Sequence, residues 1–179
     1  AMDNDDYRRG KLSTHKKYGE ANGILIGDGL LTKAMEIGLN SAYGENYIKS
    51  ARAIAKGAMN MVTGQAIDLQ DGEKNYISIY ALKTAQLISA SLEAGATYMG
   101  ASSEVVENAR AYGHHIGMAF QIADDLLDGA DNSIVKAIGT ENANELLKKE
   151  TEKAIALAEN MANKEQMQEF ATKLLKRKK

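Results

Sequence analysis

The feature that most limits the possible folds of this 179-residue chain is the complete absence of proline. Proline breaks helix interiors, whereas the helix formers Ala, Leu, Lys, Glu and Met are plentiful here. Glycine, with 16 residues, is the main helix-interrupting residue that remains. No segment alternates apolar and polar residues as a half-buried strand does. The sequence therefore predicts an all-α fold, and its length suits one domain over residues 1–179.

Apolar residues recur with helical spacing along most of the chain. We expect helices over residues 19–39, 45–69, 74–100, 102–129 and 143–162, and a short terminal helix from about residue 164. The helix over 74–100 is expected to bend where Ser89 and Ser91 meet Gly95. Ser102 or Ser103 is the expected N-cap of the helix that follows.

Composition excludes several classes of function. Because the chain has no cysteine, disulfides and thiolate metal sites are excluded, and a reducing compartment such as the cytoplasm is expected. The three histidines are too scattered for a convincing zinc site. A formal net charge of −2 gives no overall bias toward nucleic acid or a membrane surface. No apolar run approaches the roughly 20 residues of a membrane span. We therefore expect no nucleic-acid partner and no membrane span.

The segment QIADDLLDG, residues 121–129, places three aspartates among apolar residues. In a helix, Asp124 and Asp128 lie one turn apart on the same face, with Asp125 beside them. Like charges at this spacing repel one another, and desolvation near a core adds to the cost. The arrangement becomes favourable if a divalent cation binds, because Mg²⁺ prefers carboxylate and phosphate oxygens. The alternative is an exposed helix end in which all three carboxylates face water.

The N-terminal segment AMDNDDYRRGK combines acidic and basic groups. It contains Asp3, then Arg8 and Arg9, and these charges could simply pair in a solvated loop. A site for a metal-bridged diphosphate needs both kinds of group, because carboxylates hold the metal and guanidinium groups bind phosphate oxygens directly.

A third segment, YALKTAQL (residues 80–87), interrupts an otherwise apolar helix with Lys83 and Thr84. A lysine at such a position could extend to solvent. If it points inward, it could neutralise a departing diphosphate while Thr84 contributes a hydroxyl or a carbonyl oxygen.

In this order, the segments resemble those of the trans-isoprenyl diphosphate synthases, the family of farnesyl, geranylgeranyl and longer polyprenyl diphosphate synthases. DNDDYRRGK resembles the end of the first aspartate-rich motif with its Arg-Arg-Gly, and GEANGILIGDGLL resembles the next helix. GQAIDL is similar to the Gly-Gln-x-x-Asp segment, LKTAQLI to the Lys-Thr motif, and GMAFQIADDLLD to the Phe-Gln and second aspartate-rich motif. The resemblance runs nearly end to end. It implies an isoprenoid synthase-type helical bundle around a central active-site cavity, usually in a homodimer.

The resemblance also implies an activity, the Mg²⁺-dependent condensation of isopentenyl diphosphate with an allylic diphosphate by a trans-prenyltransferase. It implies that the metal-binding residues are Asp3, Asp124, Asp125 and Asp128. Arg8 would contact the allylic diphosphate and Arg9 the isopentenyl diphosphate. The catalytic and substrate-binding groups on the allylic side would be Lys83, Thr84 and Gln121. Phe120 would lie beside the isopentenyl group.

The chain departs from the family pattern in two places. The aspartates that open the first motif, and the helices before it, do not precede Asp3. The lysine-containing loop that usually follows the second motif is missing, because DGADNSIVKAIG passes almost directly to the next helix. Our hypothesis is that the chain comes from a longer enzyme, with residues missing before Ala1 and near residues 129–131.

Alternative functions stay open at this point. A class I terpene cyclase would use the same metal-triggered ionisation, but such enzymes generally lack the Arg-Arg-Gly found at residues 8–10. A non-catalytic, regulatory prenyltransferase subunit tends to lose aspartates from the second motif, whereas all three are present here. A helical scaffold without catalysis is the remaining alternative. The spacing in AMDND indicates the longer form of the first motif and a short product, C15 or C20.

Overall fold

The computed structural model describes residues 1–2, 4–40, 42, 44–129 and 133–175. The chain divides into two compact units, Ala1–Ala42 and Tyr43–Lys179, which are described separately below. The expectation of a single domain over residues 1–179 stays a prediction. None of the described helices is both long and apolar enough to cross a membrane.

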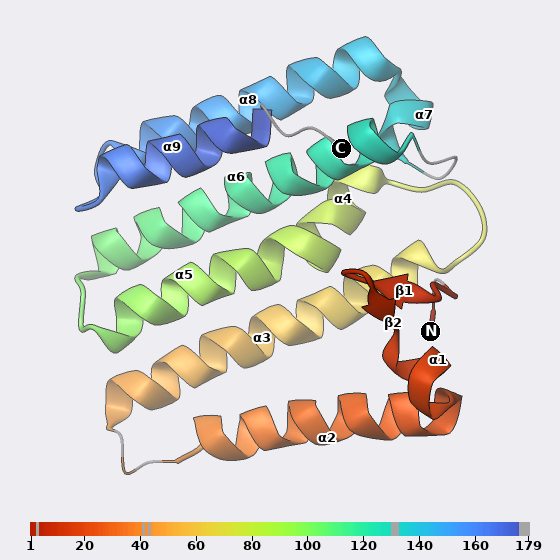
Figure 1. Ribbon diagram of the computed structural model, residues 1–179. Coiled ribbons are helices and arrows are strands. Elements are labelled where there is room, and N and C mark those ends of the chain that lie inside the picture. Colours follow the sequence, from red (N-terminus) through yellow and green to blue (C-terminus); the bar gives the residue numbers. More distant parts are fainter. Residues whose placement is uncertain (3, 41, 43, 130–132, 176–179) are drawn as a thin grey trace. The chain divides into compact units, whose positions relative to one another are not determined.

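The first unit contains a small hairpin and two helices (Figure 1). Strands β1 (Tyr7–Arg8) and β2 (Lys11–Leu12) pair antiparallel. The two residues between them, Arg9 and Gly10, have φ angles of 52° and 74°. Two consecutive positive φ angles are typical of the tight turns that match the twist of a hairpin, and glycine adopts them without strain. Helices α1 (Thr14–Tyr18) and α2 (Glu20–Gly38) follow.

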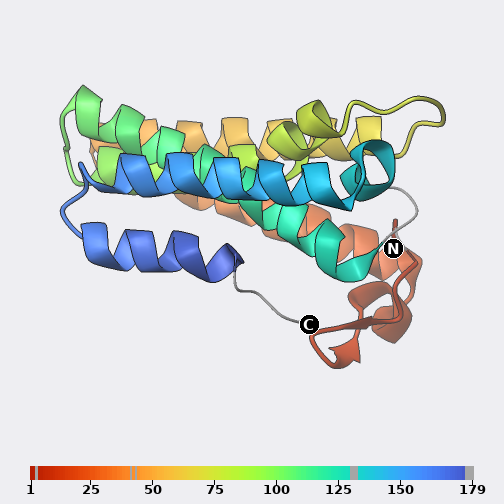
Figure 2. The ribbon, with the colours of Figure 1, turned by 90° about the horizontal axis from the view of Figure 1, so that it is seen from above.

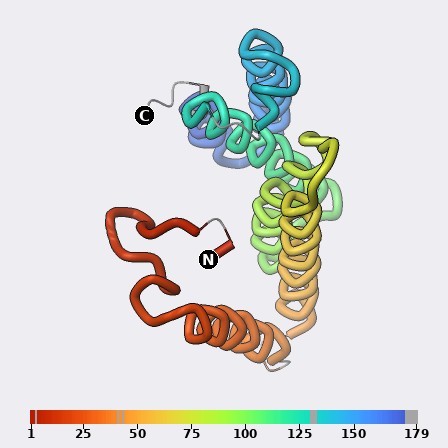
Figure 3. Tube along the Cα trace, turned by 90° about the vertical axis from the view of Figure 1, so that its right-hand side faces the viewer, coloured from red at the N-terminus to blue at the C-terminus, as the bar shows by residue number. Residues whose placement is uncertain are grey.

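The second unit is a group of long helices that pack against their neighbours in chain order (Figures 1 and 2). Its elements are α3 (Glu45–Asp68), α4 (Tyr76–Tyr80), the π-helix η2 (Ala81–Ala85), α5 (Gln86–Tyr98), α6 (Ser103–Asp128), α7 (Ile134–Ile138), α8 (Thr140–Ala158) and α9 (Lys164–Leu175). Figure 3 shows α3 and α5 as adjacent helices, and α9 packs on α8 and α6. The prediction of an all-α fold is confirmed, with the two-residue strands as the only sheet among the described residues.

Helix α6 forms the centre of the apolar core. Its side chains Tyr112, Ile116 and Ile122 are at most 3% exposed, and they pack with Ile79 of α4 and Ile134 of α7. Burying an aliphatic or aromatic side chain of this size contributes roughly 1.5–3 kcal/mol. The core therefore holds the last turns of α6 against α4 and α7, the region of the three aspartates.

The expected boundaries of this helix agree with the structure. The Ser102 side chain accepts a hydrogen bond from the backbone N–H of Val105 at 3.4 Å, which satisfies a group that lacks a partner within the helix. Gly129 closes the helix in the left-handed conformation, with φ of 60°. The missing loop was predicted near residues 129–131, of which residues 130 and 131 lie outside the described residues.

Over residues 74–100 the expected single helix is divided into α4, η2 and α5. Helix α5 is continuous through Ser89, Ser91 and Gly95, and the irregularity is the π-helix η2. The predicted bend at these residues stays a prediction, and the hydroxyls of both serines bond to backbone carbonyls. Ser89 Oγ donates to the carbonyl of Arg110 at 2.7 Å, and Ser91 Oγ donates to that of Leu87 at 2.8 Å.

Candidate functional site

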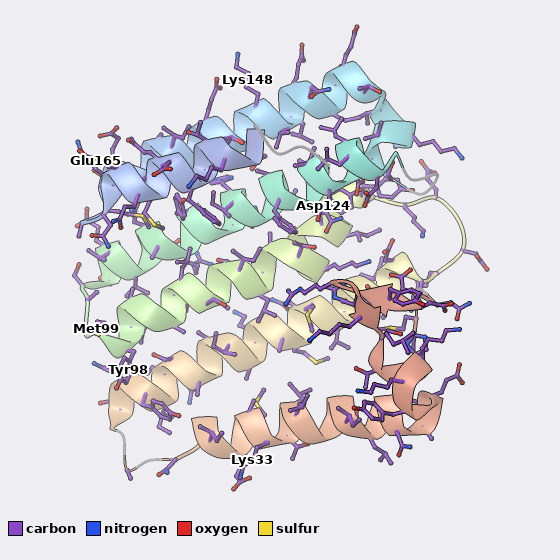
Figure 4. The ribbon with its side chains drawn as sticks, viewed as in Figure 1. Lys33, Tyr98, Met99, Asp124, Lys148 and Glu165 are labelled. Carbon is purple, nitrogen blue, oxygen red and sulfur yellow. The ribbon has the colours of Figure 1, made fainter. Side chains whose placement is uncertain are left out.

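The three aspartates near the end of α6 have different surroundings. Asp124 is partly buried, Asp125 is only 8% exposed, and Asp128 is exposed. Figure 4 labels Asp124 in the last turns of α6. Consecutive helix positions point about 100° apart, so the helix gives Asp124 and Asp125 different directions while Asp128 follows Asp124 one turn later.

Asp125 is held by hydrogen bonds from three elements. Its Oδ2 atom accepts from the hydroxyl of Tyr80 on α4 and, at 3.1 Å, from the backbone N–H of Ile134 on α7. Its Oδ1 atom accepts from Nε2 of Gln121, one turn earlier on α6, at 3.2 Å. Burial, followed by the hydrogen bond to Asp125, raises the pKa of Tyr80, so the phenol stays protonated as the donor.

Thr84 continues this arrangement onto η2. Its Oγ1 atom donates to Oε1 of Gln121 at 2.7 Å. The side chains of Thr84, Gln121, Asp125 and Tyr80 thus form one connected row that links η2, α6 and α4. The oxygen atoms of Thr84 and Gln121 can direct their dipoles at a positively charged group and stabilise it without attacking it as nucleophiles.

Lys83 points toward α3 and pairs with Asp68. Its Nζ atom lies 2.7 Å from Asp68 Oδ2, and Lys74 Nζ lies 3.5 Å from Asp68 Oδ1. Burial acts to raise the pKa of Asp68, but the hydrogen bond and charge of Lys83, together with those of Lys74, outweigh it and lower that pKa. The structure therefore places two ammonium groups around one carboxylate beside the π-helix.

Asp68 was not among the predicted site residues, although it lies in the quoted GQAIDL segment. Tyr80 was missed as well. It immediately precedes η2, but its sequence position gave no sign that its hydroxyl meets Asp125. The useful signal for Asp68 was the motif itself, because an acidic residue that is partly buried at the end of a helix needs a cationic partner.

Within the second unit, the structure brings together the predicted residues of η2 and α6. Lys83 and Thr84 lie on η2, and Phe120, Gln121 and the three aspartates lie on α6. Phe120 is partly buried against the apolar core. No group of three or more His, Asp or Glu side chains suited to a metal ion occurs within the described part of the chain. Asp3 lies outside the described residues, so its predicted role stays a prediction.

The predicted arginines lie on the hairpin of the first unit. Arg8 is in β1, opposite Lys11, and Arg9 is in the turn. Arg8 also lines a hollow of about 320 Å³ with Leu12 and His15, among others. The hairpin concentrates three cationic side chains within four residues, an arrangement suited to an anion such as diphosphate.

The donor set at the end of α6 fits a divalent cation in part. Asp124 and Asp128 supply hard carboxylate oxygens one helical turn apart, as Mg²⁺ prefers. Asp125 has both of its oxygens engaged in hydrogen bonds with protein donors. Its predicted role as a metal ligand stays a prediction.

Comparisons with known proteins agree on one family. The family model described as polyprenyl synthetase matches residues 1–179. The farnesyl diphosphate synthase of Geobacillus stearothermophilus is 39% identical over 159 residues, which cover 80% of this chain and 53% of that protein. The farnesyl diphosphate synthase of Bacillus subtilis is 37% identical over 157 residues, again 53% of its length. The chain thus spans about half the length of these curated relatives.

Solved structures show the same fold. An FPP/GFPP synthase from Zymomonas mobilis superposes with a TM-score of 0.84 at 31% identity, covering 96% of this chain and 67% of that one. A geranyltransferase from Helicobacter pylori, solved in complex with magnesium and isoprenyl diphosphate, superposes with a TM-score of 0.80 at 26% identity, covering 97% of this chain and 66% of that one. The predicted isoprenoid synthase-type fold is confirmed by these matches, and the chain belongs to the polyprenyl synthetase family.

Proposed function

We propose that the protein is a Mg²⁺-dependent trans-prenyltransferase that condenses isopentenyl diphosphate with an allylic diphosphate. The expected product is a short prenyl diphosphate, C15 or C20. The observation that carries this proposal is the row from Thr84 through Gln121 to Asp125 of α6, with Lys83 beside it. The names of the relatives support it, since they include farnesyl diphosphate synthases.

The reaction requires opposite charges to be stabilised close together. Breaking the allylic C–O bond leaves a carbocation and a diphosphate. The double bond of isopentenyl diphosphate then forms the new C–C bond, and a proton passes to the released diphosphate. The carbocation and the diphosphate each need their own protein groups, because charge that develops in a water-poor site must be stabilised by preorganised dipoles or ions.

The groups around η2 divide between these two tasks. The ammonium of Lys83 would stabilise the leaving diphosphate, and the oxygens of Thr84 and Gln121 would face the cation. Asp124 and Asp128 would hold Mg²⁺, which supplies further neutralisation of the diphosphate. Phe120 would lie beside the isopentenyl group.

The first unit would supply the remaining anion contacts. Arg8 would bind the allylic diphosphate and Arg9 the isopentenyl diphosphate, through the paired N–H donors of each guanidinium. Asp3 would complete the metal site from the first aspartate-rich motif. The Arg-Arg-Gly of the hairpin favours a prenyltransferase over a terpene cyclase, because a cyclase has no isopentenyl subsite.

We propose that the protein acts as a homodimer with α2 in the interface. Helix α2 contains no buried residue, and Leu25 and Leu30 are 66% and 69% exposed. An apolar helix face of this kind is stabilised when a partner covers it. Sedimentation equilibrium should give twice the mass of one chain, and the mass of a single chain would contradict the proposal. The expected cytoplasmic location stays a prediction.

The test of function is the variant Asp124→Asn. It removes a proposed metal ligand while keeping the size of the side chain, so kcat/KM should fall by about 100-fold or more. The matched control is Glu104→Gln, an exposed residue in the first turn of the same helix, which should retain wild-type turnover. Circular dichroism should show the same helix content in both variants. Unchanged turnover in Asp124→Asn would remove the central role assigned to that carboxylate.

A further inference from the structure

We propose that Asp125 is a positioning residue that fixes which end of the Gln121 amide faces Thr84. This inference rests on the proposed function, because it concerns the groups placed beside the allylic carbon. It assigns to Asp125 a task different from that of Asp124, its neighbour in the sequence.

The first support is that both oxygens of the Asp125 carboxylate accept hydrogen bonds. The side chain is buried, and each of its oxygens accepts from the protein. Oδ2 accepts from the Tyr80 hydroxyl and the backbone N–H of Ile134, and Oδ1 accepts from Nε2 of Gln121. An ionised carboxylate has no hydrogen to donate, so all three partners must be donors.

The second support is the asymmetry of the Gln121 side chain. Its amide has an acceptor end and a donor end, and only the NH₂ end can face an acceptor-only carboxylate. With Nε2 held 3.2 Å from Asp125, Oε1 is directed at Thr84, whose hydroxyl donates to it at 2.7 Å. The hydroxyl hydrogen of Thr84 is thereby committed to Gln121.

This commitment determines the charge that Thr84 presents to its other neighbours. A hydroxyl that donates to Gln121 turns its oxygen lone pairs away from that bond, and lone pairs stabilise a nearby carbocation. If the amide were reversed, Thr84 would accept from its NH₂ group. The hydroxyl hydrogen would then turn outward and oppose the developing positive charge.

The test is a reciprocal exchange of donor and acceptor between the two side chains. In Asp125→Asn, an amide that still accepts from Tyr80 and Ile134 places its NH₂ group against that of Gln121. In Gln121→Glu, two carboxylates meet instead. The double variant Asp125→Asn with Gln121→Glu restores one donor facing one acceptor, keeps the total charge, and again offers Thr84 an acceptor.

Each single variant should lower kcat by about tenfold or more, with KM for both diphosphates changed less than about threefold, since one buried hydrogen bond is lost in each. The double variant should recover at least part of that loss, so the two effects are not additive. The Mg²⁺ concentration for half-maximal rate should stay at the wild-type value in Asp125→Asn and rise in Asp124→Asn.

Thermal unfolding of the same four proteins separates this inference from the proposed function. The unfolding midpoint of the double variant should lie above that of Asp125→Asn. If Asp125→Asn alone folds poorly, restored folding in the double variant would support the inference in the same way. Additive midpoints would overturn the orientation of Gln121. A raised Mg²⁺ requirement in Asp125→Asn would make Asp125 a metal ligand instead. If the wild-type protein elongates no primer, the proposed function is overturned. The orientation of the Gln121 amide would then have no role in catalysis.

Discussion

At the scale of single residues, the role of Lys83 depends on its two charged neighbours, Asp68 and Lys74. It pairs with Asp68 of α3 at 2.7 Å, and its side chain is only 30% exposed. Lys74 approaches the same carboxylate from the segment between α3 and α4, at 3.5 Å. Two cations near one anion leave a net positive charge beside η2, which suits a departing diphosphate.

We predict that Lys83→Met lowers kcat/KM for the allylic substrate by about 100-fold or more, because the cation beside the leaving group is lost. Lys74→Met is the matched control, since it also removes a partner of Asp68 but lies outside η2. Steady-state rates with a saturating second substrate measure both. Equal losses in the two variants would mean that the charge around Asp68 matters and the position of Lys83 does not.

The difference between Asp124 and Asp125 could not be predicted from the sequence. Helical periodicity places the three aspartates near one another, but it does not say which of them meets α4 and α7. Tyr80 is 45 residues from Asp125 in the chain and Ile134 lies on a different helix, so their hydrogen bonds depend on tertiary packing. The resemblance to the second aspartate-rich motif identified the segment, but only the packing shows that Asp125 is the aspartate that contacts α4 and α7.

At the scale of elements, the π-helix η2 is confined by two glycines. A Cβ atom added at Gly64 of α3 would overlap the backbone of Lys83, and one added at Gly117 of α6 would overlap the backbone of Ala85. The neighbouring helices therefore approach η2 at backbone distance from both sides. π-helical turns occur frequently at functional sites, where the extra residue changes the direction of side chains.

We predict that Gly117→Ala lowers the free energy of unfolding by about 1–3 kcal/mol, the usual cost of overpacking a core. The control is Gly95→Ala in the exposed part of α5, where an added Cβ meets nothing within 4 Å. That control should be stabilising by roughly 0.5–1 kcal/mol, because alanine is the better helix former. Urea unfolding followed by circular dichroism measures both. A neutral Gly117→Ala would show that η2 can move away from α6.

The helices themselves were largely predictable, whereas η2 and the hairpin were not. Apolar spacing and the cap at Ser102 define α6 within one residue of its expected ends. The π-turn depends on the contacts with Gly64 and Gly117, which have no signature in the local sequence of η2. The hairpin needed only the Arg9-Gly10 turn, a signal too short to register among long helical patterns.

At the scale of the whole molecule, a buried charge cluster joins α6 to α8. Glu150 is 7% exposed, and its Oε2 and Oε1 atoms lie 2.6 Å from His115 Nδ1 and 2.7 Å from Lys153 Nζ. Burial acts to raise the pKa of Glu150, but these two hydrogen bonds and charges lower it from 4.5 to about 2. His115 of α6 is therefore tied to α8 by its contact with Glu150.

We predict that Glu150→Gln destabilises the protein near neutral pH by an amount on the order of 3 kcal/mol. Because the folded state lowers this pKa, the stabilisation is fully present above pH 4.5 and is lost as the pH falls toward about 2. The difference between wild type and variant should therefore shrink over that range in urea unfolding experiments. Glu152→Gln, at an exposed residue of the same helix, is the control. A difference that does not depend on pH would contradict the assignment.

The central claim is that the protein elongates allylic diphosphates, and a product assay tests it most directly. The purified protein would be incubated with Mg²⁺, labelled isopentenyl diphosphate and, in separate reactions, C5, C10 and C15 allylic diphosphates, and the products separated by chain length. We predict a discrete C15 or C20 prenyl diphosphate whose formation requires Mg²⁺. No elongated product from any of the three primers would contradict the proposal and favour a regulatory subunit.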